Sequence, residues 1–413
     1  MGHRKVSLCI ALVVIVSLLL SACGPAAAPT PTATQPAAAP AATKPAAQAT
    51  KPASEAAKPA AEATKVPAAG PTKPAAAPKP PEGPLPKSVT LATAASGTTL
   101  YSMGTGLAKV ASDAGPMQVI LQPFSGGPAW IPQMTSAGKP EVGLLNSVEG
   151  WQALTGKATP KPLPEGMSIP APYDKAYSNL RALMMGTDLT TGMLVKKDSK
   201  YQSASDLKGA RIAWGFKAHA GAALAAYTNA ALMGFTPNKD FQPVEVADPT
   251  AAVRALAEGR LDAACVAVGM GTIAEADAQV GVRYLDAPKD SANLKVAQGM
   301  MPGGRVVTLK GGSSAGVPKD TQLWGYPTVL LVPSNMPDNV AYTLVKTWWD
   351  NYAKLAPLSP QLADWKPDIF VSKTATVPYH PGAIAFYKEK GVWTKDMEDA
   401  QQELLKGELL FLK

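Results

Sequence analysis

Between residues 88 and 147, short apolar runs rich in β-branched residues alternate with longer stretches whose apolar positions have helical spacing. The runs predict strands at Ser88–Ala94, Met117–Phe124 and Glu141–Leu145, and the stretches predict helices that begin near Leu100, Ala129 and Asn146. Repeated strand–turn–helix units of this length are typical of a parallel sheet with right-handed crossovers. The pattern therefore predicts an α/β fold.

A second set of strand–helix units follows an irregular stretch at residues 157–177. Its predicted elements are strands at Ala210–Trp214, Phe241–Val246 and Arg260–Val268 and helices at Ala220–Met233 and Thr250–Glu258, each helix ended by a glycine. A further helix is predicted at Leu344–Leu355. Two similar sets of units predict two α/β lobes.

The start of the chain has a different pattern. An almost wholly apolar run, Val6–Leu20, follows Arg4 and Lys5. A membrane-spanning helix needs about 20 apolar residues, so this shorter run is typical of a secretory signal peptide. It ends in Leu20-Ser21-Ala22-Cys23, which resembles the lipobox of bacterial lipoproteins.

We therefore expect residues 1–22 to be a signal peptide and Cys23 to carry the lipid anchor; a plain signal peptide and an uncleaved anchor are the alternatives. Residues 23–86 then form a tether that is nearly all Ala, Pro, Thr and Lys and has no aromatic side chain. Such a segment buries too little apolar surface to offset its chain entropy, so we expect it to be disordered, whether its length is functional or has drifted. The remaining residues, 87–413, form the body.

Charge changes this picture little. The chain carries 39 Lys and Arg against 31 Asp and Glu, a net charge of +8, but only 17% of its residues are charged. Two of the eight excess charges lie in residues 1–23, three in the tether and three in the body. The body is nearly balanced, which disfavours a nucleic-acid partner.

Three Cys and three His disfavour a disulfide scaffold, a zinc module and a His-rich metal site, so no metal or cofactor is expected. Cys265 lies in an apolar run and is interpreted as a buried, inert thiol. His380 precedes Pro381 at a predicted helix start, and a structural role is favoured for it.

Short segments along the body occur together in the order typical of one family. They are Thr90–Tyr101, Gly126–Gly127, Ser136–Gly138, Glu141–Leu144, Asp206–Gly209, Ala255–Ala263, Pro327–Leu331, Met336–Tyr342, Pro378–Ala383 and Phe386–Gly391. This ordered set resembles the solute receptors of TAXI-type TRAP transporters (tripartite ATP-independent periplasmic transporters). Several segments depart from the family pattern where a ligand would sit: Ser96-Gly97, Leu100-Tyr101, Pro128–Trp130, Asn146 and Phe216–Gly221.

The resemblance implies the two-lobed type II periplasmic-binding-protein fold, with two strands crossing between the lobes. Lobe 1 would comprise about residues 87–187 plus C-terminal segments, and lobe 2 about residues 188–320. It implies a monomeric, extracytoplasmic receptor that captures a small carboxylate, such as glutamate or a dicarboxylate, and delivers it to an ion-gradient-driven permease.

In open α/β sheets the ligand crevice lies at the carboxyl ends of the strands, and a helix N-terminus there suits a carboxylate. The candidate ligand-binding residues, which lie mainly at such strand ends, are Ser96, Gly97, Thr98, Thr99, Tyr101, Ser125, Gly126, Asn146, Ser147, Trp214, His219, Gly221, Gly269 and Trp324. Ordinary helix capping is the alternative for the hydroxyl and amide residues and for His219. Core packing is the alternative for the two Trp.

Two other function classes remain as alternatives. A receptor for an ABC importer or a sensor kinase would have the same body. An enzyme is disfavoured, because the sequence has no Gly-x-Ser-x-Gly, P-loop, His-Glu-x-x-His or Cys-x-x-Cys motif.

Overall fold

The computed structural model describes residues 79–163 and 167–412. The expected signal peptide, the expected lipid anchor at Cys23 and most of the expected tether lie outside these described residues. None of the helices in the described part of the chain is long and apolar enough to cross a membrane.

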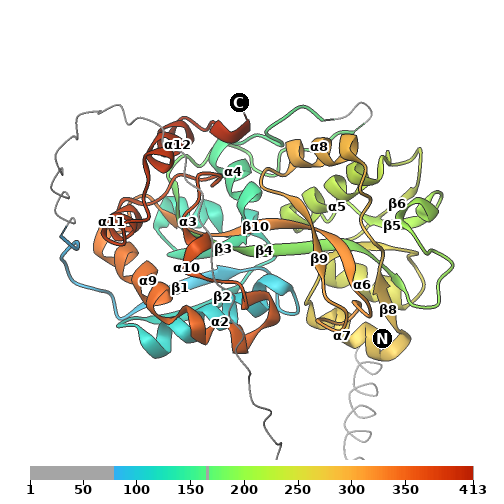
Figure 1. The fold of residues 1–413 in the computed structure, drawn as a ribbon, viewed down its shortest axis with the longest axis horizontal. Coiled ribbons are helices and arrows are strands. Elements are labelled where there is room, and N and C mark those ends of the chain that lie inside the picture. The colour runs from blue at the N-terminus through green and yellow to red at the C-terminus, as the bar shows by residue number, and fades with distance from the viewer. Residues whose placement is uncertain (1–78, 164–166, 413) are drawn as a thin grey trace, which may run out of the picture. The chain divides into compact units, whose positions relative to one another are not determined.

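An eight-stranded mixed sheet has the order β2-β1-β3-β10-β4-β7, with β8 paired to β4 and β9 paired to β10 (Figure 1). The strands are β1 (Ser88–Thr93), β2 (Gln118–Pro123), β3 (Val142–Asn146), β4 (Leu180–Lys196), β7 (Ala264–Ala267), β8 (Val282–Tyr284), β9 (Arg305–Leu309) and β10 (Thr321–Pro333). β1 pairs in parallel with both β2 and β3. The parallel strand–helix–strand arrangement predicted for residues 88–147 is confirmed.

Two long strands join the lobes. β4 has 17 residues and β10 has 13, and they pair antiparallel from Trp324–Thr191 to Pro333–Leu180. The buried apolar side chains form two clusters, one of them made mainly of residues between these strands in sequence. We call residues 197–320 the second lobe and the rest of the body the first lobe. The expected two-lobed α/β fold, with two strands crossing between the lobes, is confirmed.

The first lobe combines the N-terminal strands with C-terminal helices (Figure 1). Its helices are α2 (Thr99–Ala114), α3 (Ile131–Ala137), α4 (Ser147–Thr155), α9 (Asp338–Asn351), α10 (Pro367–Phe370), α11 (Pro381–Glu389) and α12 (Lys395–Leu405). The indole N–H of Trp348 in α9 donates to the carbonyl of Leu107 in α2 at 3.0 Å, which ties the two ends of the body together.

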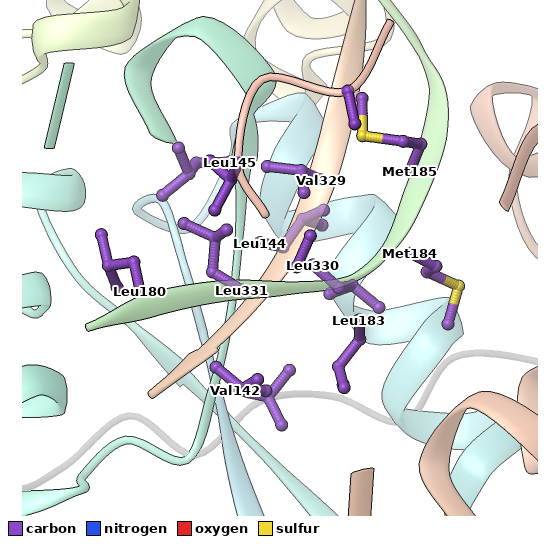
Figure 2. Close-up of a cluster of buried hydrophobic side chains, with 14 of the residues drawn as sticks. Val142, Leu144, Leu145, Leu180, Leu183, Met184, Met185, Val329, Leu330 and Leu331 are labelled. Atoms are coloured by element: carbon purple, nitrogen blue, oxygen red, sulfur yellow. The ribbon is translucent and has the colours of Figure 1, made fainter. Parts of the chain in front are cut away.

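Three strands contribute apolar side chains to the core of this lobe. Figure 2 shows part of this cluster, in which β3 contributes Val142, Leu144 and Leu145, the start of β4 contributes Leu180 and Leu183–Met185, and β10 contributes Val329–Leu331. All of these side chains are buried. Continuous apolar runs of this kind are typical of strands covered on both faces.

The second lobe contains a parallel pair of strands, β5 (Arg211–Trp214) and β6 (Gln242–Glu245). Its helices are α5 (Ala220–Met233), α6 (Pro249–Ala257), α7 (Gly271–Val280) and α8 (Ser291–Met300).

The short 3₁₀ turns of the two lobes are η1 (Gly127–Ala129), η2 (Ala204–Leu207), η3 (Tyr352–Lys354), η4 (Ala356–Leu358), η5 (Pro360–Leu362) and η6 (Leu410–Leu412).

Some predicted boundaries are wrong. The strand predicted to start at Arg260 starts at Ala264, because Asp262 instead binds Arg211 through its carboxylate at 2.9 Å and its backbone N–H. The helix predicted at Leu344–Leu355 spans Asp338–Asn351, and the polar first turn hid its start.

Candidate functional site

A cavity of about 40 Å³ lies between the two lobes, beside the crossing strands. Most of its lining side chains are buried. It is lined by Thr98, Thr99, Leu100, Asn146, Leu189, Thr191, His219, Gly221, Ala222, Ala225, Pro249, Cys265, Val266, Ala267, Met270 and Tyr326.

Five helices begin at this cavity. The N-cap residues of α2, α4, α5 and α7 are Thr98, Asn146, His219 and Met270, and Pro249 is the first residue of α6. All five residues line the cavity. A helix N-terminus carries a partial positive charge and unpaired N–H groups, so the site favours a negative group.

The N-terminus of α2 has free donors. The Thr98 hydroxyl accepts the N–H of Tyr101 at 3.2 Å and donates to the carbonyl of Ala95 at 2.7 Å. The N–H groups of Thr99 and Leu100, in the first turn, have no intrahelical acceptor. Both residues line the cavity, so these two donors are available to an anion there.

His219 begins α5 on the opposite lobe. Its Nδ1 accepts the N–H of Ala222 at 3.2 Å, which assigns the ring proton to Nε2. Burial lowers the pKa of His219 to about 4, against the opposing effect of its own backbone and of Asp248. His219 is therefore neutral at pH 7 and keeps one ring N–H as a donor, and the residue lines the cavity.

Glu149, which the sequence analysis missed, lies behind Asn146 in the first turn of α4. Its carboxylate accepts the Asn146 amide N–H at 3.0 Å and the Tyr173 hydroxyl at 3.1 Å, and its side chain is buried. Burial raises the pKa of Glu149 to about 7, although the Tyr173 and Asn146 hydrogen bonds and the backbone N–H groups of Gly127 and Gly221 lower it.

The Glu149 carboxylate also touches the second lobe. A Cβ atom on Gly221, the second residue of α5, would lie 2.5 Å from Oε2 of Glu149 and 2.3 Å from Nδ2 of Asn146. Only glycine therefore allows α5 to approach this closely. Other contacts across the lobes are the Thr99 hydroxyl on the carbonyl of Val268 at 2.8 Å and the Gly271 N–H on the carbonyl of Gly97 at 3.1 Å.

Residues 91–391 match the model of the NMT1-like family. The chain belongs to the NMT1-like family. No curated protein matches it in sequence.

Solved structures resembling this NMT1-like chain are remote in sequence. The periplasmic aliphatic sulphonate-binding protein SsuA from Escherichia coli is 16% identical, with 76% of this chain and 92% of that chain covered and a TM-score of 0.35. A TctC solute-binding protein from Polaromonas is 16% identical, with 67% and 86% covered and a TM-score of 0.38. A periplasmic transporter is 12% identical, with 76% and 95% covered and a TM-score of 0.43.

The structure brings part of the predicted site together in this NMT1-like protein. Thr98, Thr99, Asn146, His219 and Gly221 line the cavity. A second group lies next to these residues or to the contact between the lobes: Gly97, Tyr101, Gly126 and Ser147.

Other predicted residues lie away from the cavity lining. Ser96 and Ser125 are exposed, and Gly269 packs beside Gln361. Trp214 packs edge-to-face on Tyr227 and Phe241, and Trp324 is fully buried beside Gly304.

Several cavity residues carried no local signal in the sequence. Leu189 and Thr191 come from β4 and Tyr326 from β10, so the register of the crossing strands places them. Glu149 did have a signal, because an acid three residues after an Asn N-cap is typical of a capping pair. Within residues 79–163 and 167–412, no group of three His, Cys, Asp or Glu side chains could hold a metal ion.

Proposed function

We propose that this NMT1-like protein is an extracytoplasmic solute receptor that captures a small carboxylate between its two lobes and passes it to a membrane permease. The observation that carries the proposal is the convergence of five helix N-termini, from both lobes, on one cavity. No catalytic role is proposed, and no cofactor.

Binding would use donors from both lobes. The N–H groups of Thr99 and Leu100 would hold the carboxylate on the first lobe, and the Nε2–H of His219 would reach it from the second. These donors meet one anion only when the lobes are in contact, so a ligand would shift the population toward the closed form.

The finer assignments rest on the sequence. The resemblance to TAXI-type receptors supports a TRAP permease as the partner, and the Leu-Ser-Ala-Cys motif supports a lipid anchor at Cys23. We propose that the receptor is a monomer. An ABC importer or a sensor kinase is the alternative partner. Genes for TRAP permease subunits beside this one would support the proposal, whereas a neighbouring ATPase gene would contradict it.

His219→Asn tests the binding mode. Asn keeps a good N-cap for α5, but it is too short to place a donor where Nε2–H lies. A hydrogen bond to a charged group contributes about 1.5–3 kcal/mol, so we expect carboxylate affinity in calorimetry to fall by roughly tenfold or more. His380→Asn is the matched control, because His380 also caps a helix but does not line the cavity. Equal affinities for wild type and His219→Asn would contradict this binding mode.

A further inference from the structure

The cavity contains no charged partner for a second ionic group. None of its lining residues is Lys, Arg, Asp or Glu. The titratable groups that line it are His219, which is neutral, and Cys265 and Tyr326, whose pKa values are raised by burial. Asp248, one residue before the lining Pro249, caps α6, and its carboxylate already accepts the Thr250 hydroxyl and the Ala251 N–H. Burying a second, unpaired charge there would be strongly unfavourable.

Glu149 does not supply the missing partner for an ammonium group. Tyr173, Asn146 and the backbone N–H groups of Gly127 and Gly221 already surround its two oxygens. Asn146, and not Glu149, lines the cavity. When ionised, Glu149 would instead repel a second carboxylate on a ligand.

Much of the remaining lining is apolar, although the hydroxyl-bearing residues Thr191 and Tyr326 also line the cavity. We use the name apolar wall for four of its apolar residues, Leu189, Ala225, Val266 and Met270. The cavity volume is about 40 Å³, and one water needs about 10–15 Å³ on this measure. The space beside a bound carboxylate therefore suits a short alkyl chain.

We propose that this cavity selects a short-chain aliphatic monocarboxylate, of roughly two to four carbons, over dicarboxylates and amino acids. The inference rests on the proposed function and specifies which class of carboxylate the receptor binds. The carboxylate binds the N–H groups of Thr99 and Leu100, and the alkyl chain packs against the apolar wall.

The test compares ligands on the full chain in detergent micelles. Thermal melting and calorimetry are run with sodium propionate and butyrate, with succinate, glutarate and L-glutamate, and with propionamide and butyramide as uncharged isosteres. A ligand that binds only the folded state raises the melting temperature. We expect saturable stabilisation by propionate or butyrate, with at least tenfold weaker binding of the other compounds.

The possible results of these binding experiments distinguish failure of this inference from failure of the proposed function. Tighter binding of glutarate, succinate or L-glutamate would overturn the inference and leave the carboxylate receptor standing. Binding of the amides with no binding of any acid would overturn both. No binding of propionate or butyrate would overturn the inference by itself.

Two variants test whether the ligand binds in this cavity. Ala225→Leu adds a larger side chain to the apolar wall of the cavity and should abolish the rise in melting temperature with butyrate. Ala274→Leu, the same change at an exposed position of α7, should not abolish it. Met270→Ala enlarges the cavity and should improve binding of hexanoate relative to butyrate. Unchanged butyrate binding by Ala225→Leu would place the ligand elsewhere and overturn the inference, and if that variant does not fold, an unchanged preference in Met270→Ala would do the same.

Discussion

Glu149 is the buried acid in contact with both lobes beside the candidate site. Its carboxylate faces donors from α4, from Tyr173 and from the start of α5. Burial outweighs these donors and raises its pKa from the ordinary value of 4.5 to about 7. The protonation of this group is therefore linked to the stability of the folded chain.

The sign of that linkage gives a prediction for Glu149→Gln. Between about pH 4.5 and pH 7 the folded state binds more protons at Glu149 than the unfolded state does. The stabilisation is therefore present below pH 4.5 and is lost as pH rises to 7, by roughly 3 kcal/mol. We expect the free energy of unfolding of wild type, relative to Glu149→Gln, to fall by this order across that window in urea titrations.

Glu275→Gln is the matched control, because Glu275 is exposed on α7. This substitution at an exposed position should leave the free energy of unfolding close to that of wild type. A constant difference between wild type and Glu149→Gln from pH 4.5 to pH 7 would show that Glu149 does not titrate in this way.

Thr98 is the N-cap residue of α2 and lines the cavity. Thr98→Val removes the hydroxyl that accepts the Tyr101 N–H, and loss of an N-cap costs about 1 kcal/mol. We expect a lower melting temperature and weaker carboxylate binding. Ser96→Ala, at an exposed position outside the cavity lining, should change neither. Wild-type affinity in Thr98→Val would argue against α2 as the carboxylate site.

At the scale of elements, the sequence predicted the helices and strands whose apolar residues recur with a clear period. It missed those whose apolar residues show no such period. The runs around β1, β2 and β3 and the Ala-rich α5 were predicted to within a few residues. The lengths of β4 and β10 were not, because both are buried on two faces and their apolar runs show no alternation.

The residues of the candidate site also fall into a group that the sequence predicted and a group that it did not. Thr98, Asn146 and His219 were predicted because each is a polar residue at a turn before a helix. Leu189 and Tyr326 lie inside long strands, and only the pairing of those strands directs them to the cavity. Residues placed by local geometry are therefore predictable from sequence, and residues placed by register are not.

The start of α5 offers a test of how elements meet. Gly221→Ala would place a Cβ within 2.5 Å of the Glu149 carboxylate and push the lobes apart, although alanine favours the helix itself. Overpacking costs about 1–3 kcal/mol, so we expect carboxylate affinity in calorimetry to fall roughly tenfold or more, with little loss of melting temperature. Gly271→Ala, at the first position of α7, meets no atom within 4 Å and should bind as wild type does.

At the scale of the whole molecule, the crossing strands β4 and β10 join the two lobes, which also contact each other beside the cavity. Three of the contacts between the lobes near the cavity are Thr99 on Val268, Gly97 on Gly271 and Glu149 beside Gly221. Each contact lies at a helix terminus, where a carboxylate would also bind. Ligand binding and closure therefore depend on the same short segments.

Hydrogen exchange can measure this coupling directly. The N–H of Gly271 donates across the lobes to the carbonyl of Gly97, so it is protected only when the lobes are in contact. We expect a bound carboxylate to slow exchange in a peptide spanning residues 268–273, because it shifts the population toward the closed form. A peptide from the buried part of β10, residues 328–332, should exchange equally slowly with and without ligand. The same ligand should protect Gly221→Ala less at matched saturation, since that variant resists closure. Equal exchange at residues 268–273 with and without a bound ligand would mean that the lobes do not close on it.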